Sequence, residues 1–138
     1  MADGGHMNLR LSEIAHARSG DKANTSDIGL FAWEPLGYAL LAQHVSAEKV
    51  QDYFAHLWLD TSSAQTVASQ NVERFDLPNL LALKFVMRGA LNGGAASSLR
   101  SDNLGKTIAA QLLRMSIDVD EAQALAALQA SQAEINRF

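Results

Sequence analysis

The segment that decides the fold is Thr25–Trp33, with the sequence TSDIGLFAW. Ile28, Leu30 and Ala32 recur at every second position, with more polar or aromatic residues between them. An alternation with a period of two residues is typical of a β-strand that buries one face. The segment therefore predicts a strand whose opposite face carries Asp27, Gly29, Phe31 and Trp33.

The residues before this strand indicate another strand and a polar loop. An alternation of apolar and polar residues begins at Leu9 and continues to His16, which again predicts a strand. The following run, Ala17–Asn24, contains Gly20 and is rich in residues that form loops. We therefore expect this run to connect two strands.

Two helices are expected after the Thr25–Trp33 strand. Pro35 suits the first position of a helix ending near Gln43, because the missing N–H of proline would have no partner there. Ser46 is a suitable N-cap for the second helix. The spacing in that helix predicts a buried stripe at Val50, Tyr53, Phe54, Leu57 and Trp58.

Two more strands and a helix complete the pattern. One strand is expected within residues 67–77, before Pro78, and another at residues 82–88. A helix is expected at about residues 102–115. The resulting order, ββαββα, is a circular permutation of the ferredoxin-like order. We therefore predict an α+β fold, a ferredoxin-like sandwich whose four-stranded, mainly antiparallel sheet has helices on one face.

Residues 118–136 predict an extra C-terminal helix. Asp118 followed by Glu121 resembles a capping box, and the segment is rich in Ala, Gln and Leu, which favour helix. Its larger apolar residues form only a narrow seam, Leu125, Leu128 and Ile135. Either the helix folds back on its own domain, or the seam packs against a partner subunit in a homo-oligomer.

The length of 138 residues corresponds to one domain. Residues 1–7 are small, polar and glycine-rich, and we expect them to be a tag or a disordered tail. The ordered chain is expected to begin near Asn8. The expected division is therefore a tail at 1–7, a domain at 8–115 and a C-terminal helix at 116–138.

Composition excludes several classes of protein. The formal net charge is −4, which argues against a general nucleic-acid-binding surface. No apolar run approaches the length of a membrane span. The absence of cysteine excludes disulfides and thiolate chemistry and favours a reducing cytoplasm. No two histidines have the spacing of a metal site, so neither a metal nor another cofactor is expected.

The first candidate site is the polar run from His16 to Asn24. His16 has the chemistry of a general base near neutral pH, and Asp21 is the second candidate catalytic residue. The candidate ligand-binding residues of this run are Arg18, Ser19, Gly20, Lys22 and Asn24. The alternative is that the same residues build a turn, which Asp21 caps and in which Lys22 is solvated.

The second candidate site follows the strand at residues 82–88. Between Lys84 and Arg114 there are five basic residues and one acid, although the whole chain is acidic. The small residues of Gly89–Ser98 would let backbone N–H groups approach an anion beside a helix N-terminus. The alternative is a tight turn with solvated charges, since the run lacks the ending of a P-loop. The candidate ligand-binding residues are Arg88, Asn92, Gly93, Gly94, Ser98, Arg100 and Lys106.

Both candidate segments resemble one family. AHARSGDKAN at residues 15–24, followed by Ile28-Gly29, resembles the opening motif of the AtuA-like ferredoxin-fold family. The family comprises small proteins and C-terminal domains associated with AtuA, a protein of acyclic terpene utilisation. A second block, including RFDLP at residues 74–78 and GAL at residues 89–91, is similar too. Asp27 and Lys84 stand where the family pattern has asparagines, and Ala23 where glycine is usual.

The resemblance implies a ferredoxin-like fold and a bacterial role beside a larger AtuA-type protein. That role would be the breakdown of terpenoid or related branched acyl compounds, whose intermediates are coenzyme A thioesters. We therefore hypothesise that the two candidate segments meet at one end of the sheet and bind a small carboxylate or the phosphates of an acyl-CoA. The rival hypothesis is a non-catalytic module that stabilises or oligomerises with a larger AtuA-type partner. These residues do not decide whether the domain is an enzyme.

Overall fold

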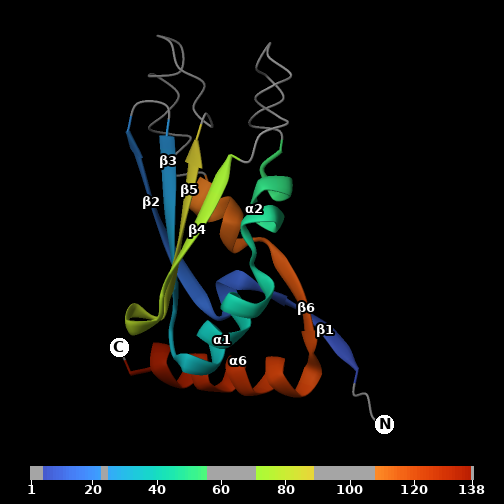
Figure 1. The fold of residues 1–138 in the computed structure, drawn as a ribbon. Coiled ribbons are helices and arrows are strands. Elements are labelled where there is room, and N and C mark those ends of the chain that lie inside the picture. Colours follow the sequence, from blue (N-terminus) through green and yellow to red (C-terminus); the bar gives the residue numbers. More distant parts are fainter. Residues whose placement is uncertain (1–4, 23–24, 56–70, 89–107, 138) are drawn as a thin grey trace.

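The computed structural model describes residues 5–22, 25–55, 71–88 and 108–137 (Figure 1). Its strands are β1 (His6–Arg10), β2 (Ala15–Lys22), β3 (Thr25–Ala32), β4 (Val72–Leu77), β5 (Ala82–Arg88) and β6 (Ser116–Asp120). Its helices are α1 (Pro35–His44), α2 (Ala47–Tyr53) and α6 (Glu121–Ile135), with a helical stretch at residues 108–113. Two 3₁₀ turns, η1 (Leu11–Glu13) and η2 (Pro78–Leu80), complete the described elements.

Four strands form one antiparallel sheet in the order β2-β3-β5-β4. The strands predicted at residues 25–33 and 82–88 are its central strands β3 and β5. Buried and half-buried residues alternate along β3, as the sequence predicts. Along the chain α1 and α2 lie between β3 and β4, and β5 lies between these two strands in the sheet. The predicted α+β class and four-stranded antiparallel sheet are therefore confirmed.

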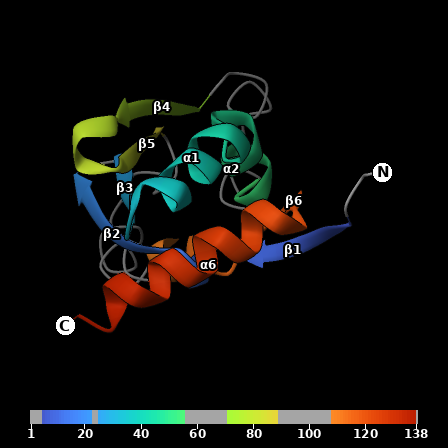
Figure 2. The same ribbon diagram turned by 90° about the horizontal axis from the view of Figure 1, so that it is seen from below.

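Helices α1 and α2 cover one face of this sheet, and the core lies between them (Figures 1 and 2). Leu30 and Phe85 from the sheet are fully buried together with Val45, Val50 and Phe54 from the helical side. Both predicted helices are present, and the Ser46 hydroxyl accepts a hydrogen bond from the Lys49 N–H, as expected of an N-cap. In the predicted stripe Tyr53 is exposed instead of buried, while Leu57 and Trp58 lie outside the described residues.

The predicted single strand up to His16 is wrong, because the chain turns sharply after Arg10. Glu13 accepts a hydrogen bond from the Arg10 N–H at 3.0 Å, and Leu11 donates its N–H to the Met115 carbonyl at 2.9 Å. These contacts end β1 and start η1, and the chain then enters β2. Leu11 and Ile14, two apolar residues of the alternation that predicted the strand, are buried at the start of this turn and just after it.

The polar run Ala17–Asn24, predicted as a loop, continues β2 as far as Lys22. Ser19 pairs with Ile28 and Gly20 with Asp27 along the β2–β3 ladder. Polar residues are tolerated there because β2 is an edge strand, one face of which is not covered by α1 or α2. The predicted loop is wrong because pairing with β3 overrides the local preference of these residues for a loop.

A second, two-stranded sheet pairs β1, the first described strand, with β6, the last described strand. His6 pairs with Asp120 and Met7 with Val119, so these two residues belong to a strand and not to a tail. The expectation that the ordered chain begins near Asn8 is wrong for the same reason. Asp118 lies within β6, and the predicted capping role falls to Asp120, which accepts a hydrogen bond from the Gln123 N–H at 3.1 Å.

Helix α6 folds back on its own domain and lies beside α1 (Figure 2). Its fully buried residues are the small ones, Ala124, Ala127 and Ser131, and Ser131 donates a hydrogen bond to the Glu34 carboxylate at 3.5 Å. Leu125, in contrast, is 53% exposed. Of the predicted seam, Leu128 is half-buried and packs against the core, Ile135 is half-buried, and Leu125 faces solvent, while small side chains let α6 approach α1 closely. The alternative, in which the seam packs against a partner subunit, stays a prediction.

Candidate functional site

The face of the four-stranded sheet that points away from α1 and α2 is called the outer face here. Register pairs its residues across the strands in rows, because side chains opposite one another in a ladder share a face. It carries His16, Arg18 and Gly20 of β2, Asp27, Gly29 and Phe31 of β3, Ala82, Lys84 and Val86 of β5, and Glu73, Phe75 and Leu77 of β4.

Three neighbouring rows differ in chemistry. The cation row consists of Arg18, Gly29, Lys84 and Phe75. The apolar row consists of His16, Phe31, Ala82 and Leu77. The acid row consists of Gly20, Asp27, Val86 and Glu73. The cation row lies between the other two along β3, because Gly29 lies between Asp27 and Phe31.

A pocket of about 320 Å³ lies over these rows on the outer face. Three of its residues, Arg18, Ser19 and Gly20, belong to the predicted site. The lining residues that the prediction missed are Asp27, Gly29, Phe31, Leu77, Leu80, Ala82, Leu83 and Lys84. The alternation in β3 and β5 does signal that Asp27, Gly29, Phe31 and Lys84 face away from the core, but it does not reveal which of them are neighbours.

Gly29 shapes the floor of this pocket. A Cβ atom at position 29 would lie 2.8 Å from Cε2 of Phe31, so the Phe31 ring occupies the space that a side chain would fill. At Gly20 the nearest atom to such a Cβ would be Oδ1 of Asp27 at 3.5 Å, which is an ordinary contact. Sterics therefore favour glycine at position 29 but not at position 20.

His16, a predicted catalytic residue, is not among the lining residues of the pocket, but it pairs with Phe31, which lines it. Its ring stacks on Phe31 with the centroids 5.3 Å apart and contacts Trp33 with the centroids 4.7 Å apart. Partial burial, and to a lesser degree the positive charge of Arg18, lower the pKa of His16 below its ordinary value of 6.5. The imidazole is therefore mainly neutral at pH 7 and can accept a proton.

Two cations of the pocket are available to a ligand. Within the described ranges, neither Arg18 nor Lys84 is joined to a carboxylate by an ion pair. Arg88, also predicted to bind the ligand, forms an ion pair with Glu73 at the end of β5. Asp27 is the acidic residue among the lining residues. The pocket thus has two cations and one carboxylate.

The remaining predicted site residues are only partly described. Asp21 and Lys22 pair through their backbones with Ser26 and Thr25, and their side chains lie outside the description. Thr25 also pairs with Arg88, so the end of β2 and the end of β5 lie at the same end of the sheet. The predicted residues that lie outside the described part of the chain are Asn24, Asn92, Gly93, Gly94, Ser98, Arg100 and Lys106.

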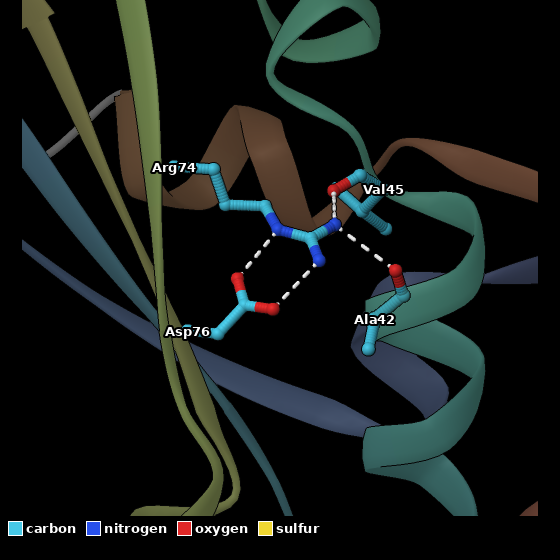
Figure 3. Close-up of polar contacts among 4 residues, drawn as sticks. All are labelled: Ala42, Val45, Arg74 and Asp76. Atoms are coloured by element: carbon cyan, nitrogen blue, oxygen red, sulfur yellow. Dashed lines mark hydrogen bonds and ion pairs between the residues drawn. The ribbon is translucent and has the colours of Figure 1, made fainter.

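The motif at residues 74–78 holds the fold together on the opposite face (Figure 3). Arg74 donates from Nη1 to the carbonyls of Ala42 at 3.0 Å and Val45 at 2.9 Å, near the C-terminus of α1. Its Nε and Nη2 donate to the two carboxylate oxygens of Asp76 at 2.7 and 2.9 Å. The Arg74 guanidinium lowers the pKa of Asp76 chiefly through this hydrogen bonding. These two residues therefore attach β4 to α1 instead of contacting the pocket.

The sheet, the pocket and the Arg74 contacts lie within a stretch of the chain that matches a known family. The model of the AtuA ferredoxin-like domain matches residues 9–118. The chain belongs to this family. The AtuA ferredoxin-like domain thus includes the outer face and ends within β6, before α6.

No curated protein and no solved structure matches the chain. In the parts of this AtuA ferredoxin-like protein that the structure describes, no helix is both long and apolar enough to cross a lipid bilayer.

Proposed function

We propose that this protein is a cytoplasmic accessory protein in the bacterial breakdown of acyclic terpenes or related branched acyl compounds. In this role it binds a small carboxylate, or the phosphates of an acyl-CoA, on the outer face of its sheet. The family membership supports the metabolic setting, and the chemistry of the pocket supports an anionic ligand.

The observation that carries this proposal is the placement of Arg18 and Lys84 on either side of Gly29. Two steps between neighbouring strands separate their Cα atoms by roughly 10 Å, so both long side chains can reach one anion that lies above the Phe31 ring edge covering Gly29. Because position 29 has no side chain, the edge of the Phe31 ring covers this point of β3 and forms an apolar floor between the two cations. Arginine offers a fork of donors to a carboxylate or phosphate, and lysine adds a mobile positive charge.

His16 is the residue of this site that we assign to proton transfer, because its lowered pKa keeps it neutral beside Arg18. Asp21 is the other candidate, as a residue that orients or polarises a carbonyl. Binding is the first role of the domain, and turnover by the purified protein is the observation that would add catalysis to it.

We also propose that the fold is a circular permutation of the ferredoxin-like fold. The strand order β2-β3-β5-β4 is the one that a ferredoxin-like sheet has when its chain is cut between the first helix and the second strand. We therefore describe the domain as a permuted ferredoxin-like sandwich, to which the β1–β6 sheet and α6 are additions.

Isothermal titration of isovalerate and isovaleryl-CoA into the protein tests the anion site. Arg18→Ala and Lys84→Ala are each expected to weaken binding about tenfold, since a charged hydrogen bond contributes about 1.5 kcal/mol or more. The matched controls are Arg114→Ala and Lys49→Ala, which change exposed cations outside the pocket. Equal binding by all five proteins, or no binding of either ligand, would reject the proposal.

A second candidate function is the non-catalytic module, which stabilises or oligomerises with a larger AtuA-type partner. It is favoured by three large apolar residues exposed on β4 and η2, namely Phe75 at 46%, Leu77 at 38% and Leu80 at 62%. Co-expression with the larger AtuA-type protein, comparing wild type with Leu80→Asp, tests it. Copurification that Leu80→Asp abolishes would support this function, and its absence from wild type would contradict it.

A further inference from the structure

The pocket on the outer face has one charged end and one apolar end. On β3 the cation row lies at Gly29 and the apolar row at Phe31. Residues two apart along a strand are separated by roughly 7 Å. The polarity of the lining therefore changes within a length comparable to that of a few methylene groups.

The apolar end is exposed to an unusual degree. Leu77 and Leu80 line the pocket together with Phe31, and both leucines are among the large apolar residues exposed to solvent. A ligand with an apolar chain would cover them and remove apolar area from water on both sides. Inorganic anions would use only the cation row.

The acid row closes the other side of the anion position. Asp27 lies two residues from Gly29, on the side away from Phe31. With the apolar chain toward Phe31, a second carboxylate at the far end of that chain would lie among apolar residues and lose solvation there, and on the opposite side it would approach Asp27. The arrangement therefore favours a ligand with a single anionic group at one end.

We propose that the pocket binds a short-chain monocarboxylate, with its carboxylate between Arg18 and Lys84 and its apolar chain over Phe31, Leu77 and Leu80. This inference rests on the proposed anion site and narrows its ligand class. The volume of about 320 Å³ is at the lower end of the range for small-molecule sites. It suits a short acyl chain and is too small for a whole acyl-CoA.

Titrations of the ¹⁵N-labelled protein with acetate, butyrate and hexanoate, followed by NMR, measure the weak affinities of such ligands. Wild type is expected to bind about fourfold more tightly for each added methylene. Leu80→Ser should reduce this dependence on chain length, so that its loss of affinity increases from acetate to hexanoate. Leu125→Ser, which replaces another exposed leucine, on α6, is the control and should behave as wild type.

The same titrations separate the two proposals. Arg18→Ala should weaken all three carboxylates by the same factor. Arg18-dependent binding with no dependence on chain length would overturn the monocarboxylate proposal and leave the anion site standing. Binding that ignores Arg18→Ala would overturn both. A chain-length dependence that Leu80→Ser leaves intact would place the chain elsewhere and also overturn the inference.

Charge selectivity gives a second readout that does not depend on Leu80. Succinate has the same number of carbons as butyrate and one more carboxylate, so wild type should bind it more weakly than butyrate. Asp27→Asn should tighten the binding of both ligands, because it removes the negative charge beside the anion position that the two ligands share. Tighter binding of succinate than of butyrate by wild type would contradict the proposed orientation.

Discussion

The ring of Phe31 lies over Gly29, where a Cβ atom would stand only 2.8 Å from Cε2 of the ring. The Phe31 ring can take this place in the pocket floor because residue 29 has only a hydrogen atom as its side chain. It also connects the anion position to His16, because the His16 ring stacks on Phe31.

Gly29→Ala is expected to displace the Phe31 ring without unfolding the protein. The ring is the far end of a half-buried side chain and can move, and alanine is preferred to glycine in a strand, so the free energy of unfolding should change by about 1 kcal/mol or less. Carboxylate affinity should fall, and the NMR signals of His16 should shift.

Gly20→Ala is the control for this change, because a Cβ there meets Asp27 only at an ordinary contact distance of 3.5 Å. It should leave the His16 signals in place. Identical effects of the two substitutions on affinity and on His16 would show that the Phe31 ring does not depend on Gly29.

The pKa of His16 should respond to Arg18. Burial is the larger cause of its lowering and the Arg18 charge the smaller one. Arg18→Gln should therefore raise the pKa of His16 while leaving it below 6.5. NMR titration of the imidazole measures this. The pKa of His44, lowered by burial and by Lys49, should not move, and an equal change at both histidines would contradict the assignment.

The same lowering has a consequence for stability. The folded protein holds the pKa of His16 below its unfolded value. The contribution of neutral His16 to the free energy of unfolding is therefore fully present above the unfolded pKa and is lost as pH falls through the folded pKa. His16→Gln should flatten this part of the dependence of stability on pH, measured by urea unfolding between pH 7.5 and 5. An unchanged slope would contradict the lowered pKa.

Arg74→Gln should destabilise the fold without a direct effect on the pocket. It leaves the carbonyls of Ala42 and Val45 without their donor and removes the fork to Asp76, so we expect a loss of about 2 kcal/mol in the free energy of unfolding. Arg114→Gln, on an exposed side chain, should cost less than about 0.5 kcal/mol. Similar urea midpoints for the two variants would show that the Arg74 contacts do not hold α1 to β4.

Helix α6 should tolerate changes at Leu125 and resist changes at Ala127. Ala127→Leu places a large side chain in a fully buried position and should cost about 1–3 kcal/mol. Leu125→Ala, at an exposed position, should cost less than about 0.5 kcal/mol.

Gel filtration of the Leu125→Ala protein completes that comparison. If Leu125 belongs to no subunit interface, the variant elutes at the same volume as wild type. A change of oligomeric size with an unchanged free energy of unfolding would instead show that Leu125 belongs to a subunit interface.

The central strands of the fold could be predicted because their local pattern and their tertiary environment agree. In β3 and β5 one face meets the core and the other does not, so the alternation at Ile28, Leu30 and Phe85 directly reports burial. Ser46 likewise acts within its own helix, and its role could be predicted from its type and position.

The elements that the sequence pattern does not predict depend on contacts between segments that are distant in sequence. β1 needs β6, and η1 needs the carbonyl of Met115, more than 100 residues away. Polar residues of β2 become a strand only because β3 pairs with them. The buried face of α6 consists of small residues, which a search for large apolar side chains overlooks.

In the candidate site, too, some residues can be predicted from the local sequence and others only from the folded sheet. His16, Arg18 and Gly20 could be singled out from their chemistry, and Arg18 does line the pocket. In the sequence, Lys84 stands out only as part of a basic stretch and as a departure from the family pattern. Strand register places Lys84 in the same row as Arg18. Register is a property of the folded sheet that no single segment reveals.

The most direct test of the anion site is an NMR map of carboxylate binding on the ¹⁵N-labelled protein. Titration with hexanoate should shift the backbone signals of Arg18, Gly29, Phe31 and Lys84 and leave those of α6 and the β1–β6 sheet in place. These shifts should weaken in Arg18→Ala and persist in Arg114→Ala. Shifts confined to other parts of the chain, or identical shifts in the two variants, would contradict binding on the outer face.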